Sequence, residues 1–187
     1  MNMADKIEEI DLGEKISADE LQSVLKKEEL VEILKNDADD ISIRDLMEIY
    51  TNMLKEGKYV QRSYHGDYIR FYIKSFSKYL KGLKTDETPY NSYVDMEKLG
   101  GTVEHLQKMF EESEKDSSPG SKKILYLTSI YSTFVLEEPI HIVGSQFPGG
   151  LKVKKNGETY LCPVKDKQKE SPNALCKFCI AEQEEGV

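Results

Sequence analysis

The stretch 61–80, QRSYHGDYIRFYIKSFSKYL, decides the fold that this chain predicts. Four large apolar residues recur in it at intervals of three and four, with further aromatic residues beside them: Ile69, Ile73, Phe76 and Leu80. This spacing places apolar side chains along one face of an α-helix. A stripe this wide indicates a helix that several neighbours contact, so we expect the rest of a bundle to form around it.

Helical periodicity also occurs in four other parts of the chain, each preceded by residues that are typical of a helix start. We expect these helices to follow Ser17, Ser42, Thr102 and Pro119. Gly100–Gly101 comes directly before the third, so that helix should begin only after the two glycines. Residues 1–16 are polar and should form a frayed turn or a disordered arm. Residues 1–138 thus predict a mainly α-helical bundle of five or six helices.

Three polar features of the bundle raise the question of a site there, and each has an ordinary structural explanation. His65 lies one turn before the first isoleucine of the apolar stripe, which favours a hydrogen-bonded structural histidine over a ligand or catalytic group. His105 has polar neighbours and is expected at the surface. A hydroxyl-bearing stripe of Tyr126, Ser129 and Thr133 in the last helix should face water.

The composition is that of a soluble cytoplasmic protein. The chain has 187 residues, of which 39% are hydrophobic and 32% charged, enough to bury one sizeable core. No apolar run approaches the roughly 18 residues of a membrane helix. The acidic N-terminal region lacks the basic start and apolar core of a signal peptide. We therefore expect no membrane contact.

The charge of the chain opposes a general role on nucleic acid but leaves one region open. The formal net charge is −8, whereas nucleic-acid binding relies on basic surface. Residues 152–177 are locally basic and contain seven lysines. Such a run is typical of a solvated face, so we expect a protein partner, with nucleic-acid binding through this region as the lesser alternative.

The stretch 139–187 differs from the bundle because turn residues and short β-prone runs dominate it. Asn156–Gly157 stands between two such runs, and Asn-Gly in this setting is a strong hairpin signal. The hairpin returns the chain so that Cys162 leaves its second strand. We predict a C-terminal module with a small β-hairpin, packed on the bundle.

All three cysteines lie in this module, and an odd number without secretory features argues against a disulfide framework. Cys176 and Cys179 form a Cys-x2-Cys pair, whose thiolates can converge on one tetrahedral ion. Together with His141 and Cys162 they make a candidate Cys3His zinc site. An iron–sulfur cluster on the three cysteines is the alternative cofactor. Without a metal, the cysteines would be a redox pair or ordinary buried thiols.

The role of such a site depends on His141. As the fourth ligand it closes the site, which is then structural and fastens the module to the bundle. Without it, an open coordination position could hold water, with Glu137, Glu138 or Asp166 as an acid–base partner. We favour the closed site, and the chain contains no nucleotide-binding loop, serine nucleophile motif or EF-hand pattern.

Four motifs of the module carry a resemblance to a known group of proteins. They are Glu138-Pro139-Ile140-His141, Phe147-Pro148-Gly149-Gly150, Tyr160-Leu161-Cys162-Pro163-Val164-Lys165 and Cys176-Lys177-Phe178-Cys179, with Gly144 between the first two. In these motifs the chain resembles an uncharacterised protein family of methanogenic archaea, known as UPF or domain-of-unknown-function proteins. The resemblance implies an archaeal cytosolic setting and no particular activity. An anaerobic setting would favour the iron–sulfur alternative somewhat.

These observations together predict a cytoplasmic metal-binding protein in which structural zinc supports a protein-interaction role. The alternative is a metal- or iron–sulfur-dependent enzyme of unknown reaction. The sequence leaves open whether there is any catalysis.

Overall fold

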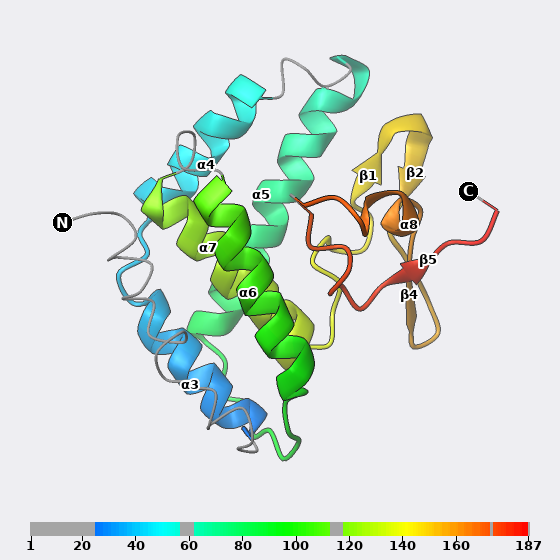
Figure 1. Ribbon diagram of the computed structural model, residues 1–187. Helices are drawn as coiled ribbons and strands as arrows, with labels where there is room; N and C mark the ends of the chain where they lie inside the picture. Colours follow the sequence, from blue (N-terminus) through cyan, green and yellow to red (C-terminus); the bar gives the residue numbers. More distant parts are fainter. Residues whose placement is uncertain (1–24, 57–61, 113–117, 173, 187) are drawn as a thin grey trace.

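The structure, a computed structural model, describes residues 25–56, 62–112, 118–172 and 174–186 (Figure 1). In these ranges the chain is mainly helical, as predicted. The larger helices are α3 (Lys27–Ala38), α4 (Ile43–Glu56), α5 (Arg62–Lys84), α6 (Met96–Glu112) and α7 (Pro119–Ile130). A π-helix, η3 (Tyr131–Val135), continues α7. The arm expected at residues 1–16 and the helix expected after Ser17 lie outside the described residues.

Short strands follow the helices and form two small antiparallel or mixed sheets. Their bounds are β1 (Gln146–Phe147), β2 (Leu151–Lys152), β3 (Lys154–Asn156), β4 (Thr159–Cys162) and β5 (Glu182–Gln183), with a 3-10 turn η4 (Pro148–Gly150) and a short helix α8 (Lys165–Gln168) between them. β1 pairs with β2, and β3, β4 and β5 form the second sheet, in which β4 and β5 run parallel.

The predicted hairpin is present as β3 and β4, but its turn is shifted by one residue. Asn156 is paired with Thr159, so Gly157 and Glu158 make the turn. Gly157 takes the left-handed conformation, with φ of 61°, which glycine adopts at little cost. Cys162 is the last residue of β4, where the sequence placed it.

The most deeply buried helix is α7, which contacts all four other large helices. Ile124, Leu127 and Ile130 have no exposed surface. The expectation that the hydroxyl-bearing stripe faces water is wrong, because Tyr126, Ser129 and Thr133 are buried as well. The hydroxyls of Tyr126 and Ser129 have no hydrogen-bond partner among the described residues, so burying them costs stability.

Helix α6 runs straight through the two glycines that were expected to precede it. It begins at Met96, and Asp95 accepts a hydrogen bond from the Lys98 N–H at its N-terminus. Glycines inside a helix cost about 1 kcal/mol each relative to alanine. Gly101 has a packing reason for its position, since a Cβ there would lie 3.4 Å from the Phe178 ring of the C-terminal module.

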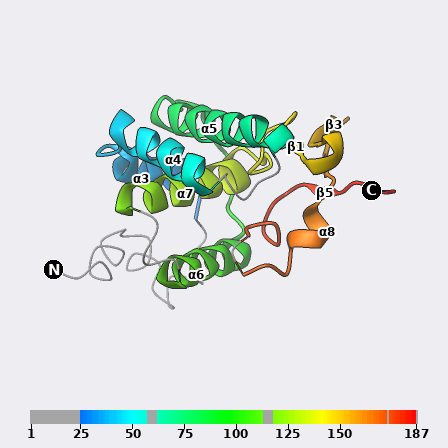
Figure 2. The same ribbon diagram turned by 90° about the horizontal axis from the view of Figure 1, so that it is seen from above.

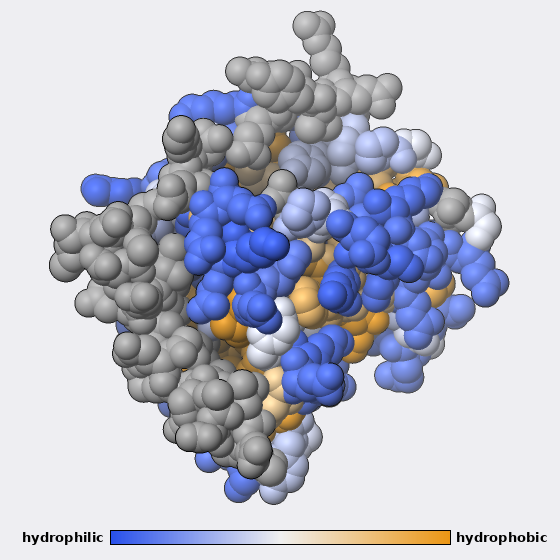
Figure 3. Space-filling model, in the orientation of Figure 1, coloured by the Kyte–Doolittle hydropathy of each residue, from blue (hydrophilic) through white to orange (hydrophobic). Residues whose placement is uncertain are grey.

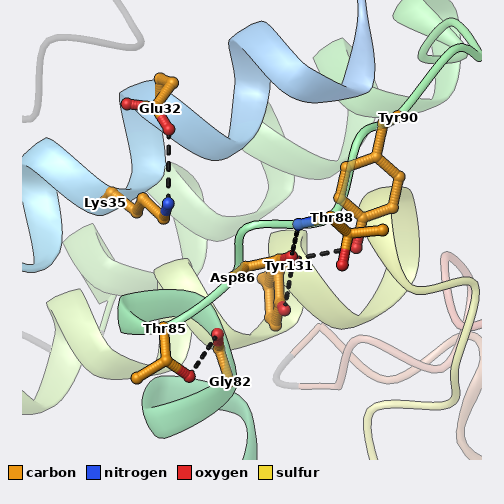
Figure 4. A network of polar contacts seen from close by, with 8 residues as sticks. All are labelled: Glu32, Lys35, Gly82, Thr85, Asp86, Thr88, Tyr90 and Tyr131. Carbon is orange, nitrogen blue, oxygen red and sulfur yellow. Dashed lines mark hydrogen bonds and ion pairs between the residues drawn. The ribbon is translucent and has the colours of Figure 1, made fainter.

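A buried carboxylate ties the end of α5 to the start of η3 (Figure 4). Asp86 accepts hydrogen bonds from the Tyr131 hydroxyl at 2.7 Å, the Tyr90 hydroxyl at 2.8 Å and the Thr88 N–H at 2.9 Å. Burial alone would raise the pKa of this carboxyl, but these hydrogen bonds outweigh it and hold the pKa below its ordinary value. The charged form of Asp86 is therefore part of the folded state.

We expect Asp86→Asn to lower the free energy of unfolding at pH 7 by about 2 kcal/mol, because it weakens hydrogen bonds to a buried charged group. A carboxyl whose pKa is lowered on folding stabilises the fold above its unfolded pKa and loses that contribution as pH falls through the folded value. The difference between wild type and variant should therefore shrink below the ordinary pKa of 3.8.

Urea titrations at several pH values measure this difference, with the exposed neighbour variant Glu87→Gln as a control that should behave like wild type. A difference that stayed constant down to pH 3 would contradict the account of Asp86.

None of the helices in the described ranges is both long and apolar enough to cross a membrane.

Candidate functional site

The chain leaves the bundle through a turn that the bundle itself holds in place. Glu137 has φ of 52°, a left-handed conformation that is uncommon outside glycine. Its carboxylate is 2.6 Å from the ammonium group of the mostly buried Lys27. Two residues later, the Tyr79 hydroxyl donates to the Pro139 carbonyl at 2.7 Å. Helices α3 and α5 thus fix the direction in which the chain reaches His141.

The imidazole of His141 lies between two aromatic rings. Its centroid is 5.2 Å from the ring of Tyr72 on α5 and 5.5 Å from that of Phe147 on β1, both approached edge to face. Burial lowers the pKa of His141 to about 4, so the ring is neutral at pH 7. A neutral imidazole is the form that binds metals.

The three cysteines are free thiols that gather in the C-terminal module. Cys162 is buried and packs with Val153 and Ala181, and Cys179 lies against the same small core. The parallel pairing of β4 with β5 sets Cys162 opposite Gln183 and so brings the end of the Cys-x2-Cys segment back to it.

The thiols are close enough to influence one another. Burial raises the pKa of Cys176 to about 11, and the neighbouring thiols of Cys179 and Cys162 add to the shift. Burial also raises the pKa of Cys162, with Cys179 as a further contributor. Catalytic and redox-active thiols have lowered pKa values, so the raised pKa values of Cys162 and Cys176 do not suit an activated nucleophile.

Other groups around Cys162 favour its thiolate. The backbone N–H groups of Val164 and Lys165 bond its sulfur and lower its pKa, partly offsetting burial. The Lys165 side chain also lowers the pKa values of Cys162 and Cys176, and its ammonium group donates to the carbonyls of Cys179, at 2.9 Å, and of Ala181. Donors aimed at sulfur together with a nearby cation suit a negatively charged thiolate cluster.

The segment that carries Cys176 and Cys179 is docked on α6. The His105 ring donates through Nε2 to the Ala174 carbonyl at 3.1 Å, and its centroid lies 5.4 Å from that of Phe178. His105 is therefore half-buried at this contact, and the expectation of a surface residue is wrong. Gly101 and His105 lie one turn apart on α6, and this spacing in the sequence indicates one helix face that could contact another segment. Figure 2 shows α5 and α6 on opposite sides, with the C-terminal module at their common end.

On the face shown in Figure 3, an apolar band is visible between the hydrophilic surfaces of the helices and of the C-terminal module. The module also contacts α5, since the Tyr64 hydroxyl donates to the Gln146 carbonyl. The thiols and His141 thus lie where a separate structural unit meets two helices of the bundle.

The structure does not assemble the four expected ligands into one centre. Within the described ranges, no three His, Cys, Asp or Glu side chains form a group that could hold a metal ion. His141 is flanked by Tyr72 and Phe147, and burial is the cause of its lowered pKa. Tyr72, which contacts His141, also senses the thiol segment. Burial and Tyr68 raise the pKa of Tyr72 most, and Cys176 raises it further. The Cys3His site stays a prediction.

The carboxylates considered as acid–base partners are engaged elsewhere. Glu137 pairs with Lys27, Glu138 with Lys78 and Asp166 with Lys169.

His65 lies in α5 on another side of the bundle. It borders a hollow with Leu54 and Ile69, and its Nε2 atom is buried with no hydrogen-bond partner among the described residues. The expectation of a hydrogen-bonded structural histidine is wrong at that atom.

Several lysines of the basic region have partners within the module. Lys154 pairs with Glu184, Lys169 with Asp166, and the Lys155 ammonium group lies 4.9 Å from the centre of the Tyr160 ring. Nucleic-acid binding through residues 152–177 stays a prediction, and these contacts do not favour it.

A helical bundle with a cysteine-bearing C-terminal module is thus the class of protein that this fold defines. The chain belongs to the family described as "Uncharacterized protein conserved in archaea (DUF2115)", which matches residues 26–184. This confirms the resemblance seen in the sequence.

Its relatives include UPF0305 proteins of methanogens. One from Methanothermobacter thermautotrophicus is 31% identical over 159 residues, covering 85% of this chain and 97% of that protein. One from Methanocaldococcus jannaschii is 30% identical over 163 residues, covering 83% and 95%. No solved structure matches the chain.

The docking of the thiol segment on α6 can be tested with His105→Ala. Loss of a hydrogen bond worth about 1 kcal/mol should make segment opening about fivefold more frequent. The amides of Phe178 and Cys179, which both bond the Leu175 carbonyl at 3.1 Å, should then exchange hydrogen about fivefold faster. Amide exchange measured by NMR checks this, with Lys108→Ala on an exposed position of α6 as control. Equal exchange in all three proteins would argue against the contact.

Proposed function

We propose that this protein binds one zinc ion through Cys162, Cys176 and Cys179, and that the ion fastens the C-terminal module to the bundle. The observation that carries the proposal is that Cys179 packs against the small core that contains Cys162, although the segments of Cys162 and of the Cys-x2-Cys pair are 14 residues apart; the pKa of Cys176 is also raised by both other thiols, after burial. Zinc would supply a positive charge that deprotonates and joins them, replacing protonated thiols by thiolates. The raised pKa of Cys176 weighs against the alternative of a redox pair.

The environment of the thiols fits a bound cation. With three thiolates around one divalent ion, the centre carries a net negative charge, and Lys165 would balance it. The backbone N–H groups on the Cys162 sulfur would remain as donors to a metal-bound thiolate. Metal binding would require small movements of the thiols, because their present arrangement does not form a metal-holding group.

His141 is our candidate for the fourth ligand. It is neutral at pH 7, and it contacts the ring of Tyr72, whose pKa Cys176 helps to raise after burial and Tyr68. A rotation of the His141 ring between Tyr72 and Phe147 would be needed for it to join the thiols. A closed centre of this kind would be structural, and the module it stabilises would serve to contact a protein partner in the cytoplasm.

A metal- or iron–sulfur-dependent enzyme is the second candidate function. Three cysteines without a fourth protein ligand would leave an open position, which favours a substrate or a cluster. An iron–sulfur cluster would bind the same thiols, so the two candidates differ in the metal found and in the role of His141.

Elemental analysis of protein purified without oxygen tests the proposal. We expect one zinc per chain and no visible absorbance. Cys176→Ser and Cys179→Ser should each lose the zinc and lower the melting temperature by roughly 5–10 °C, because a tightly bound ion stabilises a chain of this size by about 3 kcal/mol. Lys177→Ser, between the two cysteines and exposed, should keep both the metal and the melting temperature.

Iron with visible absorbance would replace the zinc proposal by the cluster alternative. Protein that contains no metal, and whose melting temperature zinc does not raise, would overturn both. His141→Ala separates the closed from the open centre, since only in the closed centre should it weaken zinc binding.

A further inference from the structure

Helix α4 exposes an apolar stripe that the bundle does not use. Ile43, Met47, Tyr50 and Leu54 are exposed by 76%, 57%, 40% and 43%. Their spacing of four, three and four residues is that of the a and d positions of a coiled coil. Helix α4 packs on α5 and α7 (Figure 1), and the exposure of the four residues places the stripe outside that packed face. An apolar stripe with this spacing is suited to pack against another helix.

The two ends of the stripe have opposite shapes. At the N-terminal end, Ile43 is the most exposed large apolar residue in the described part of the chain. At the C-terminal end, Tyr50 and Leu54 border a hollow of about 520 Å³ between α4 and α5. Ile69 and Ile73 line its inner side, and a Cβ at Gly66 would meet nothing within 4 Å. One end of the stripe is a protrusion and the other a depression, about 16 Å apart along the helix.

A twofold axis through the middle of α4 would exchange these ends. Crossing the helix between Met47 and Tyr50, it would set two copies of α4 antiparallel, with Ile43 facing Leu54 of the other copy and Met47 facing Tyr50. Each protruding Ile43 would then enter the other copy's hollow. The stripe is therefore complementary to itself, which a surface meant for an unrelated helix does not require.

The size and charge of the surface agree with this pairing. With roughly 200 Å² on each large side chain, the exposed fractions amount to about 400 Å² of apolar surface. A standard interface buries about 800 Å² on each partner, somewhat more than half of it apolar. At the Ile43 end, Asp40 pairs with Lys123, and Asp39 and Asp45 outnumber Arg44. Lys74, beside the Arg70–Asp67 ion pair, borders the hollow that this end would meet.

We propose that the protein forms a twofold-symmetric homodimer through the α4 stripe, with Ile43 of each chain inserted into the hollow between α4 and α5 of the other. The C-terminal module is not part of this interface, so the dimer is independent of the metal proposed above.

The first test is the oligomeric state in solution. Light scattering after size exclusion, between about 1 and 100 µM protein, should show a dimer for the full chain, since interfaces of this size associate at such concentrations. Ile43→Asp and Leu54→Lys should each give a monomer. Neither should unfold the helix, because an acid at its N-terminus and a base at its C-terminus both suit the helix dipole. Val143→Glu, at a half-exposed apolar residue elsewhere, should leave the dimer intact.

A mixture of the two monomeric variants tests the antiparallel register. In a dimer of one Ile43→Asp chain and one Leu54→Lys chain, the introduced carboxylate faces the introduced ammonium group, and the other pair keeps Ile43 against Leu54. We expect this mixture to form a heterodimer. A parallel pairing would set position 43 against position 43 and would not be rescued.

A substitution that fills the hollow tests the proposal without changing any residue of the α4 stripe. Gly66→Phe should weaken dimerisation at least tenfold while the helix content stays unchanged, since the added side chain enters open space. Full-length protein that is monomeric throughout the concentration range, or a dimer that survives Ile43→Asp, would overturn the proposal.

Discussion

The burial of α7 on every side is the constraint on which the rest of the structure depends. A helix in contact with four others cannot expose a polar face, so its hydroxyls are buried with it. Thr128 satisfies its hydroxyl by donating to the Ile124 carbonyl at 2.7 Å, whereas the hydroxyls of Tyr126 and Ser129 have no hydrogen-bond partner in the described part of the chain. The same helix continues into η3, where Tyr131 reaches Asp86 and fixes the end of α5. From this anchored position the chain turns at Glu137 and enters the C-terminal module, so the location of His141 follows from the packing of α7.

The module gains its order from two helices and from its own strand pairing. Helix α5 holds β1 through Tyr64, and α6 holds the thiol segment through His105 and the cavity that Gly101 leaves for Phe178. The parallel pair of β4 and β5 joins the two halves of the module, together with the Lys165 hydrogen bonds to the carbonyls of Cys179 and Ala181 and the Lys154–Glu184 ion pair. A metal ion on the three thiols would add a further link at the same place, which would give it a structural purpose.

Sequence periodicity was a good guide where local structure and packing agree. The helices after Ser42 and Pro119 and the hairpin at Asn156–Gly157 were predictable, because apolar spacing and turn residues act over a few positions. Spacing could not show which helix is central, since α5 and α7 have equally apolar stripes. Nor could it show that Gly101 sits inside a helix, because the reason is the ring of Phe178, 77 positions away. The sequence could predict that the three cysteines belong to one module. It could not predict that Cys162 lies near the Cys-x2-Cys segment, because that depends on the parallel pairing of β4 with β5.

The π-helix after α7 has a consequence for how this chain tolerates changes in length. In η3 the Leu136 N–H bonds the Tyr131 carbonyl, five residues back, so the segment contains one residue more than an α-helix would need. Removing a single residue there would let α7 run on as a regular helix and would leave the residues beyond it in nearly the same register, because the wider π-turn holds the extra residue. The side chains that follow would keep their places beside the ring of Tyr72 and the ammonium group of Lys27. A relative shortened by one residue here could therefore keep its C-terminal module seated, whereas the same deletion within α7 would rotate everything beyond it by about 100°.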